Sequence, residues 1–142
     1  MKKGFGARWQ AGYTLMELLV VLVILGLLAT IATTQVLRYL EHAKISTAKT
    51  QVESFGGALD LFKLDVGRYP TTPEGLEALL KEPAGAEHWN GPYVKATTSL
   101  NDPWGHPFRY RSPGEHGEYD LFSYGSDDAA AKGGDPPIRN WK

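Results

Sequence analysis

The feature that most constrains this chain is an apolar stretch of about 25 residues near its start, from Tyr13 to Leu37, in which Glu17 is the only charged side chain. At about 1.5 Å per residue, a helix of this length spans the hydrocarbon core of a bilayer, which is about 30 Å thick. We therefore expect a membrane-spanning helix over residues 13–37.

The segment before it, residues 1–12, carries Lys2, Lys3 and Arg8 and no acidic residue. Basic residues flanking a membrane span stay on the cytoplasmic side. The sequence therefore predicts a single-pass membrane protein, with its N-terminus in the cytoplasm and the remainder of the chain exported.

The junction between these two segments has a specific pattern, because Gly12 is followed by Tyr13, Thr14 and Leu15, and Glu17 stands five places after the glycine. This pattern resembles the N-terminal signature of type IV pilins and of the pseudopilins of type II secretion, although Tyr13 stands where phenylalanine is usual. The resemblance implies that a bacterial prepilin peptidase removes residues 1–12 as a leader and methylates the new N-terminus at Tyr13. The apolar segment would then be retained.

An ionisable side chain inside an apolar span is costly and usually has a partner. Cleavage would create an ammonium group on Tyr13, which the Glu17 carboxylate can neutralise within the subunit or on a neighbouring subunit. Pairing with a neighbour would set the axial stagger between subunits. The alternative is that Glu17 reaches the membrane surface and has no role in assembly.

Helical periodicity continues beyond the span, so residues 38–66 are expected to form the outer half of one helix about 75 Å long. Its apolar positions recur every three or four residues and predict a face that packs on a domain: Ile45, Ala48, Val52, Phe55, Leu59 and Phe62. Thr33 and Thr34 stand where the family commonly has a proline, so no compulsory break is expected there. Gly56 and Gly57 cost this helix roughly 2 kcal/mol in propensity, and we expect a close approach of the globular part as the reason.

The remainder, residues 67–142, predicts a small α+β domain. Gly67 is expected to end the long helix, and a short helix follows near residues 73–80, capped either by Thr72 or by a capping box of Thr71 with Glu74. Strands are expected at residues 108–111 and 119–124, joined as a hairpin, with a further short strand at 93–95. The predicted fold is therefore α+β and type IV pilin-like, with the long helix packed against a small antiparallel sheet.

Taken over nearly the whole chain, the resemblance narrows to the major pseudopilin family of type II secretion. The residues that carry it are Tyr69, Pro70 and Thr71, Gly75 to Leu79, Asp102 to Pro107, Asp120 and Leu121, Gly125, Asp127, Gly133 and Gly134, and Asn140 and Trp141. The resemblance implies a homopolymer that forms a periplasmic filament and helps push folded exoproteins through the outer membrane. Minor pseudopilins and an inner-membrane platform are the implied partners.

The C-terminal loop is the candidate metal site. Asp127, Asp128 and Asp135 place hard oxygen ligands in one flexible segment, which suits calcium. The family resemblance implies Asp127 and Asp135 as side-chain ligands, with backbone carbonyls from Tyr124 and neighbours such as Ser126. The chain has no cysteine, so no disulfide can stabilise an exported domain of this size, and either a metal or oligomerisation is expected to do so. The alternative is a solvated acidic loop.

Other functional classes find little support. Without residues 1–12 the chain has 12 basic residues (15 less the three of the leader) against 16 acidic ones, which does not favour nucleic-acid binding. The histidines lack zinc-ligand spacing, and neither a nucleophile elbow nor a phosphate loop occurs, so we expect no enzyme. Two alternatives remain open: a type IV pilin of an adhesion or motility fibre, and a secreted calcium-dependent binding domain with an ordinary signal peptide.

Overall fold

The computed structural model describes residues 12–126 and 136–142, except for the side chains of residues 32 and 33. Its elements are helix α1 (Leu15–Val66), the short 3-10 helix η1 (Gly75–Leu79), and strands β1 (Arg109–Arg111), β2 (Asp120–Ser123) and β3 (Ile138–Arg139). The chain divides into two compact units, Met1–Leu40 and Glu41–Lys142, and α1 contributes to both. The predicted α+β class is confirmed.

Helix α1 runs without interruption through 52 residues. Its threonines do not break it, because their hydroxyls donate to the carbonyls of the preceding turn: Thr30 to Gly26 and Leu27, at 3.0 and 2.8 Å, and Thr34 to Ile31, at 3.0 Å. The expectation that the chain has no compulsory break here is confirmed. Gly67 follows the helix with φ +83° and its N–H donates to the Lys63 carbonyl, as expected for a C-terminal cap.

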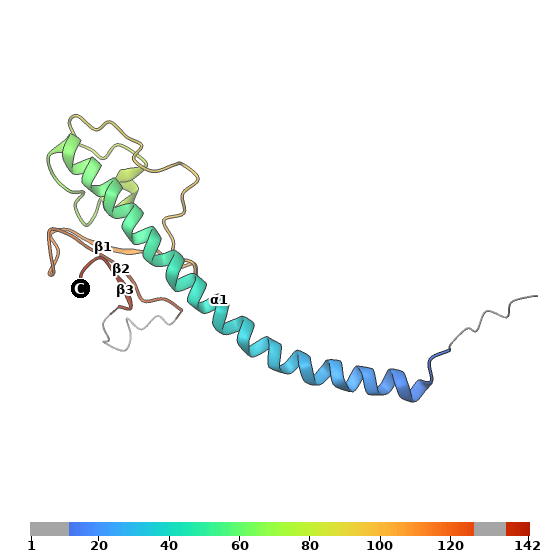
Figure 1. Ribbon diagram of the computed structural model, residues 1–142. Helices are drawn as coiled ribbons and strands as arrows, with labels where there is room; N and C mark the ends of the chain where they lie inside the picture. Colours follow the sequence, from blue (N-terminus) through green and yellow to red (C-terminus); the bar gives the residue numbers. More distant parts are fainter. Residues whose placement is uncertain (1–11, 127–135) are drawn as a thin grey trace, which may run out of the picture. The chain divides into compact units, whose positions relative to one another are not determined.

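The hydrophobic core of the second unit forms where the apolar face of α1 meets the chain that returns to it. Phe55, Leu59 and Phe62 are almost completely buried, with Ala48 and Val52, and they pack against Leu76, Leu79, Phe108, Leu121 and Ile138. Phe55 meets Phe108 edge to face, with ring centres 5.6 Å apart. In Figure 1 the three strands lie beside the C-terminal half of α1. The predicted packing face is confirmed.

The sheet is antiparallel with the order β1-β2-β3. Tyr110 pairs with Leu121 in the predicted hairpin, and Ser123 pairs with Ile138 of β3, a strand that the sequence did not predict. The strand expected at residues 93–95 is wrong. Tyr93 instead fastens a loop, because its N–H donates to the Leu79 carbonyl and its hydroxyl donates to Asp65, both at 2.8 Å.

The caps of the short helix also differ from expectation. Thr72 does not cap it, because its hydroxyl is engaged with the backbone N–H and carbonyl of Ser112, each at 3.0 Å. The capping-box alternative is half realised, since Thr71 N–H donates to the Glu74 carboxylate at 2.7 Å. Glu74 is also held by Arg68, whose hydrogen bond lowers the pKa of this carboxyl to about 2 against the effect of burial.

Candidate functional site

The expected cleavage point lies just before α1. Gly12, Tyr13 and Thr14 precede the helix in non-helical conformation and are exposed, and no described atom lies within 4 Å of a Cβ built at Gly12. The residues on both sides of the peptide bond between Gly12 and Tyr13 are therefore exposed. Residues 1–11 lie outside the described residues.

Thr14 forms the N-terminal cap of α1. Its hydroxyl accepts a hydrogen bond from Glu17 N–H at 3.2 Å, and its carbonyl accepts from the N–H groups of Glu17 and Leu18. This satisfies donors at the helix start that would otherwise have no partner once removed from water. This role was not predicted, although Thr14 and Glu17 have the threonine-x-x-glutamate spacing of a capping box, which is the signal that indicates it.

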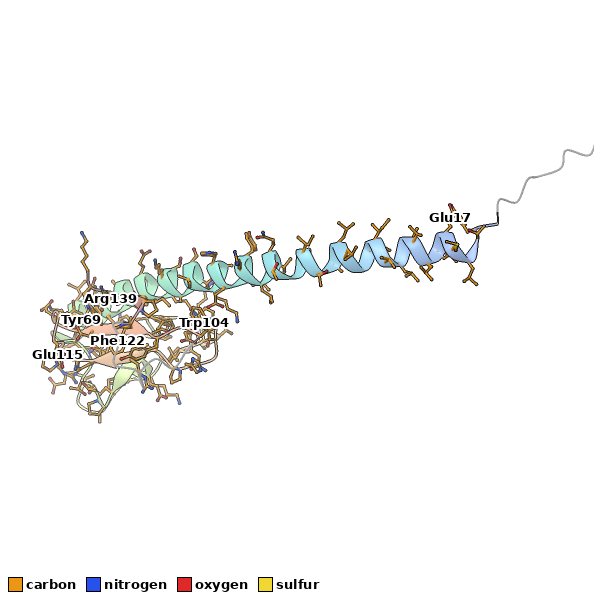
Figure 2. All side chains as sticks on the ribbon, turned by 90° about the horizontal axis from the view of Figure 1, so that it is seen from below. Glu17, Tyr69, Trp104, Glu115, Phe122 and Arg139 are labelled. Carbon is orange, nitrogen blue, oxygen red and sulfur yellow. The ribbon has the colours of Figure 1, made fainter. Side chains whose placement is uncertain are left out.

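Glu17 lies in the first turn of α1 and is exposed (Figure 2). A carboxylate at this position interacts favourably with the positive end of the helix dipole. The described side chains of the apolar segment after it are also exposed, and none of its most apolar window is buried within the described chain. By length and composition α1 is able to cross a membrane. An apolar surface on all sides requires lipid or protein around it.

The predicted metal ligands fall partly outside the described chain. Asp127 and Asp135 belong to residues 127–135, which the structure does not describe, whereas Tyr124 and Ser126 are described. Tyr124 is half-buried with its ring edge-on to Phe122, and Ser126 is exposed. Among the described residues, no group of three or more acidic, histidine or cysteine side chains is placed to hold a metal ion.

The base of this loop is held by a buried network around Asp102. Its carboxylate accepts hydrogen bonds from the N–H groups of Trp104 and His106 and, at 2.5 Å, from the Ser123 hydroxyl. The Ser123 oxygen in turn accepts from Gly125 N–H at 3.0 Å. Because Ser123 pairs with Ile138 in the sheet, the two ends of the loop leave from neighbouring strands. Asp102 stands in the segment that carries the family resemblance, but no local pattern in the sequence predicts this network.

Trp104 connects the same network to α1. Its indole N–H donates to both carboxylate oxygens of Glu41, at 3.1 and 3.3 Å, and a Cβ built at Gly125 would lie 3.8 Å from its ring. Trp104 therefore touches the start of the C-terminal loop and fixes the first residue of the second unit. No sequence signal pairs residues 63 positions apart.

A second buried carboxylate, Asp120, organises the hairpin. It accepts from Arg111 at 2.8 Å and from Glu115 N–H at 2.9 Å, and the Nδ1 of His116 lies 3.2 Å away. Burial alone would raise the pKa of Asp120, but these donors lower it to about 2. His116 also stacks on Trp141 with ring centres 4.2 Å apart, so the residues around Asp120 connect the hairpin to the C-terminus.

A long, exposed N-terminal helix that continues into the core of a small antiparallel α+β unit defines a filament subunit of the pilin-like class. Residues 10–33 match the prokaryotic N-terminal methylation motif. Residues 35–141 match the family described as type II secretion system (T2SS), protein G, and the chain belongs to this family. The prediction made from the sequence is confirmed, and the comparisons favour neither alternative.

Several relatives resemble the chain over nearly its whole length. The type II secretion system core protein G of Pseudomonas aeruginosa is 43% identical, over 94% of this chain and 96% of the relative. That of Vibrio cholerae is 41% identical, over 94% and 93%. The crystal structure of the major pseudopilin from enterohaemorrhagic Escherichia coli is similar with a TM-score of 0.59 and 28% identity, covering 74% of this chain and 92% of that one.

Proposed function

We propose that this chain is stored in the bacterial inner membrane and polymerises into the periplasmic filament of a type II secretion system. One observation carries this proposal. Helix α1 is continuous, its apolar N-terminal part is exposed wherever it is described, and its C-terminal part belongs to an α+β unit that matches the family. Moving such helices from lipid into a bundle of copies stabilises the polymer. The chain's partners would be its own copies, minor pseudopilins and the inner-membrane platform of the secretion system.

Processing by a prepilin peptidase is part of the same proposal. The enzyme would cleave between Gly12 and Tyr13 and methylate Tyr13, and the match to the methylation motif together with the exposure of these residues supports this. The helix cap at Thr14 lies beyond the cut and would survive it.

The experiment is the intact mass of the protein recovered from membranes of cells that contain a prepilin peptidase. We expect the loss of residues 1–12 and the gain of one methyl group. A loss extending to about residue 32 would instead identify a secreted domain and would overturn the filament proposal. A peptidase-deficient strain, in which residues 1–12 should be retained, is the control.

A calcium ion in the C-terminal loop is proposed as the element that holds this domain in shape. The donors available at the described base of the loop, the carbonyls of Tyr124 and Ser126, are hard oxygen atoms of the kind calcium prefers, and Asp127 and Asp135 would add carboxylates. The pairing of Ser123 with Ile138 supports the proposal because it brings the two ends of the loop together, at the same end of strands β2 and β3.

The test is thermal unfolding of the fragment 41–142 with and without a calcium chelator. We expect the chelator to lower the melting temperature, because an ion that binds only the folded state stabilises it. An Asp127→Asn, Asp135→Asn double variant should melt at the chelated temperature with or without calcium. A melting temperature that the chelator leaves unchanged would contradict the site.

A further inference from the structure

The second unit contains a face of α1 whose side chains are exposed in the described chain. At 100° per residue, six positions lie within about 30° of one line along the helix, on the side opposite the buried core residues. They are Ala43, Ser46, Thr50, Gly57, Leu61 and Leu64, all exposed, and we call them the outer strip.

The composition of the outer strip is unusual for a solvated helix face. The exposed centre of an amphipathic helix normally carries charged residues. Here it carries none, and Glu53 and Asp60 lie along one edge instead. Leu61 and Leu64 are 53% and 78% exposed, and the Thr50 hydroxyl donates to the Ser46 carbonyl of its own helix at 3.2 Å. The strip therefore presents a surface suited to an apolar partner.

Gly57, within the outer strip, also requires an explanation. A glycine inside a helix is unfavourable relative to alanine, so its presence needs a reason. For Gly56 the reason lies within the subunit, because a Cβ there would lie 3.2 Å from the Tyr119 hydroxyl. For Gly57 no described atom lies within 4 Å of such a Cβ. Space left open at this glycine allows the backbone of another helix to approach closely.

The surface beside the outer strip contains two grooves. A groove of about 360 Å³ is lined by Ser46, Thr47, Thr50, Gln51 and Ser54. A second groove of about 430 Å³ begins at Ser54 and Gly57 and runs past Leu61 to Tyr93 and Val94. Ser54 lines both grooves, which therefore adjoin in one shallow depression along α1, and Gln51, Ala58 and Lys95 also line it. Ridges of side chains on a second helix fit such a depression.

We propose that the outer strip receives the apolar segment of α1, Leu15–Leu40, from a second copy of the chain, with the closest crossing at Gly57. That segment exposes apolar side chains on all sides and carries only Glu17 and Arg38 as charges, so an uncharged face complements it. The proposal rests on the proposed filament function and adds which face of the outer half of α1 makes the contact.

The first test is a size series at Gly57 in the full chain, expressed with its secretion system and peptidase. Filament is measured as the sedimentable fraction of processed subunit. We expect Gly57→Ala to stay within twofold of the wild type in its amount of filament and Gly57→Leu to lose at least tenfold, with processing unchanged and the melting temperature not lowered in either variant. Ala84→Leu, which adds a leucine at an exposed turn that lines neither groove, is the matched control and should assemble normally.

The second test holds even if Gly57→Leu unfolds the domain. The chain has no cysteine, so Leu61→Cys can be combined in turn with Leu22→Cys, Leu27→Cys or Leu28→Cys, which point roughly 100° to 140° apart around the apolar segment. A disulfide needs Cβ atoms within about 4.5 Å. We expect at least one pair to give covalent chains of subunits within the filament, and neither cysteine alone to do so.

The outcomes separate the two proposals. Normal assembly of Gly57→Leu, or filaments in which none of the pairs cross-links, would overturn the contact at the outer strip and leave the filament function standing. A wild-type chain that forms no filament would overturn the proposed function, and this inference with it.

Discussion

At the scale of single residues, the second unit depends on two buried carboxylates that gather donors from separate loops. Asp102 accepts hydrogen bonds from backbone N–H groups and from the Ser123 hydroxyl. Asp120 accepts them from the Arg111 guanidinium and from the Glu115 N–H. A buried charge is tolerated only when its hydrogen bonds are satisfied. Both residues sit at the ends of loops, so each converts a flexible segment into a fixed one.

The pH dependence of stability follows from Asp120. Its folded pKa, about 2, lies below the ordinary carboxyl value of 3.8, so its contribution is fully present above the ordinary value and is lost as the pH falls through about 2. We expect Asp120→Asn to lower the free energy of unfolding of fragment 41–142 by about 2 kcal/mol at pH 7 and to flatten its pH dependence between pH 4.5 and 2.

Urea unfolding at a series of pH values measures this effect. Glu74, whose pKa is also lowered to about 2, titrates in the same window, so part of the slope remains until Glu74→Gln is added. Glu115→Gln, which removes the exposed partner of Arg111, is the control and should change stability by less than about 1 kcal/mol. An undiminished slope in the double variant would contradict the assignment.

At the scale of elements, the two halves of α1 are stabilised in different ways, and one residue ends the helix. Its C-terminal half is held by the core, and its N-terminal half is an apolar helix whose backbone groups are satisfied internally, as a membrane requires. Gly67, with φ +83°, turns the chain back toward η1. A residue with a Cβ is disfavoured in that conformation.

The same substitution should therefore have opposite effects at two glycines. We expect Gly67→Ala to lower the free energy of unfolding of fragment 41–142 by about 1 kcal/mol, because alanine is strained at positive φ. Gly57→Ala should raise it by roughly 0.5 to 1 kcal/mol, because alanine favours the helix and meets no described neighbour there. Urea unfolding of the two variants checks both, and effects of the same sign would contradict this account of α1.

At the scale of the whole molecule, the chain is a subunit whose apolar half is not buried by the rest of the described chain. Glu17 is the residue through which neighbouring copies would be set in register, by pairing with the ammonium of a processed Tyr13. Removing one partner of a buried ion pair costs about 3 kcal/mol, because the other charge is left unpaired in a low dielectric. The pairing would thus be a property of the polymer rather than of one isolated chain.

We expect Glu17→Gln to be processed normally yet to shift the equilibrium between subunit and filament by about a hundredfold toward the subunit. The sedimentable fraction of methylated protein measures this shift, and Glu87→Gln, an exposed acidic residue of the second unit, is the control. Wild-type amounts of filament from Glu17→Gln would show that the carboxylate has no role in assembly.

The sequence by itself determined those features that depend on residues close together along the chain. The apolar run, the three-and-four spacing from Ile45 to Phe62, the Gly67 cap and the hairpin all follow from periodicity or turn chemistry between near neighbours. The tertiary structure decided the rest. Strand β3 is two residues long and exists only because β2 pairs with it, and Asp102 meets Ser123 only through the fold. Tyr93 reads as a strand residue, yet its bonds to Leu79 and Asp65 hold it in a loop, because contacts distant in sequence outweigh local propensity.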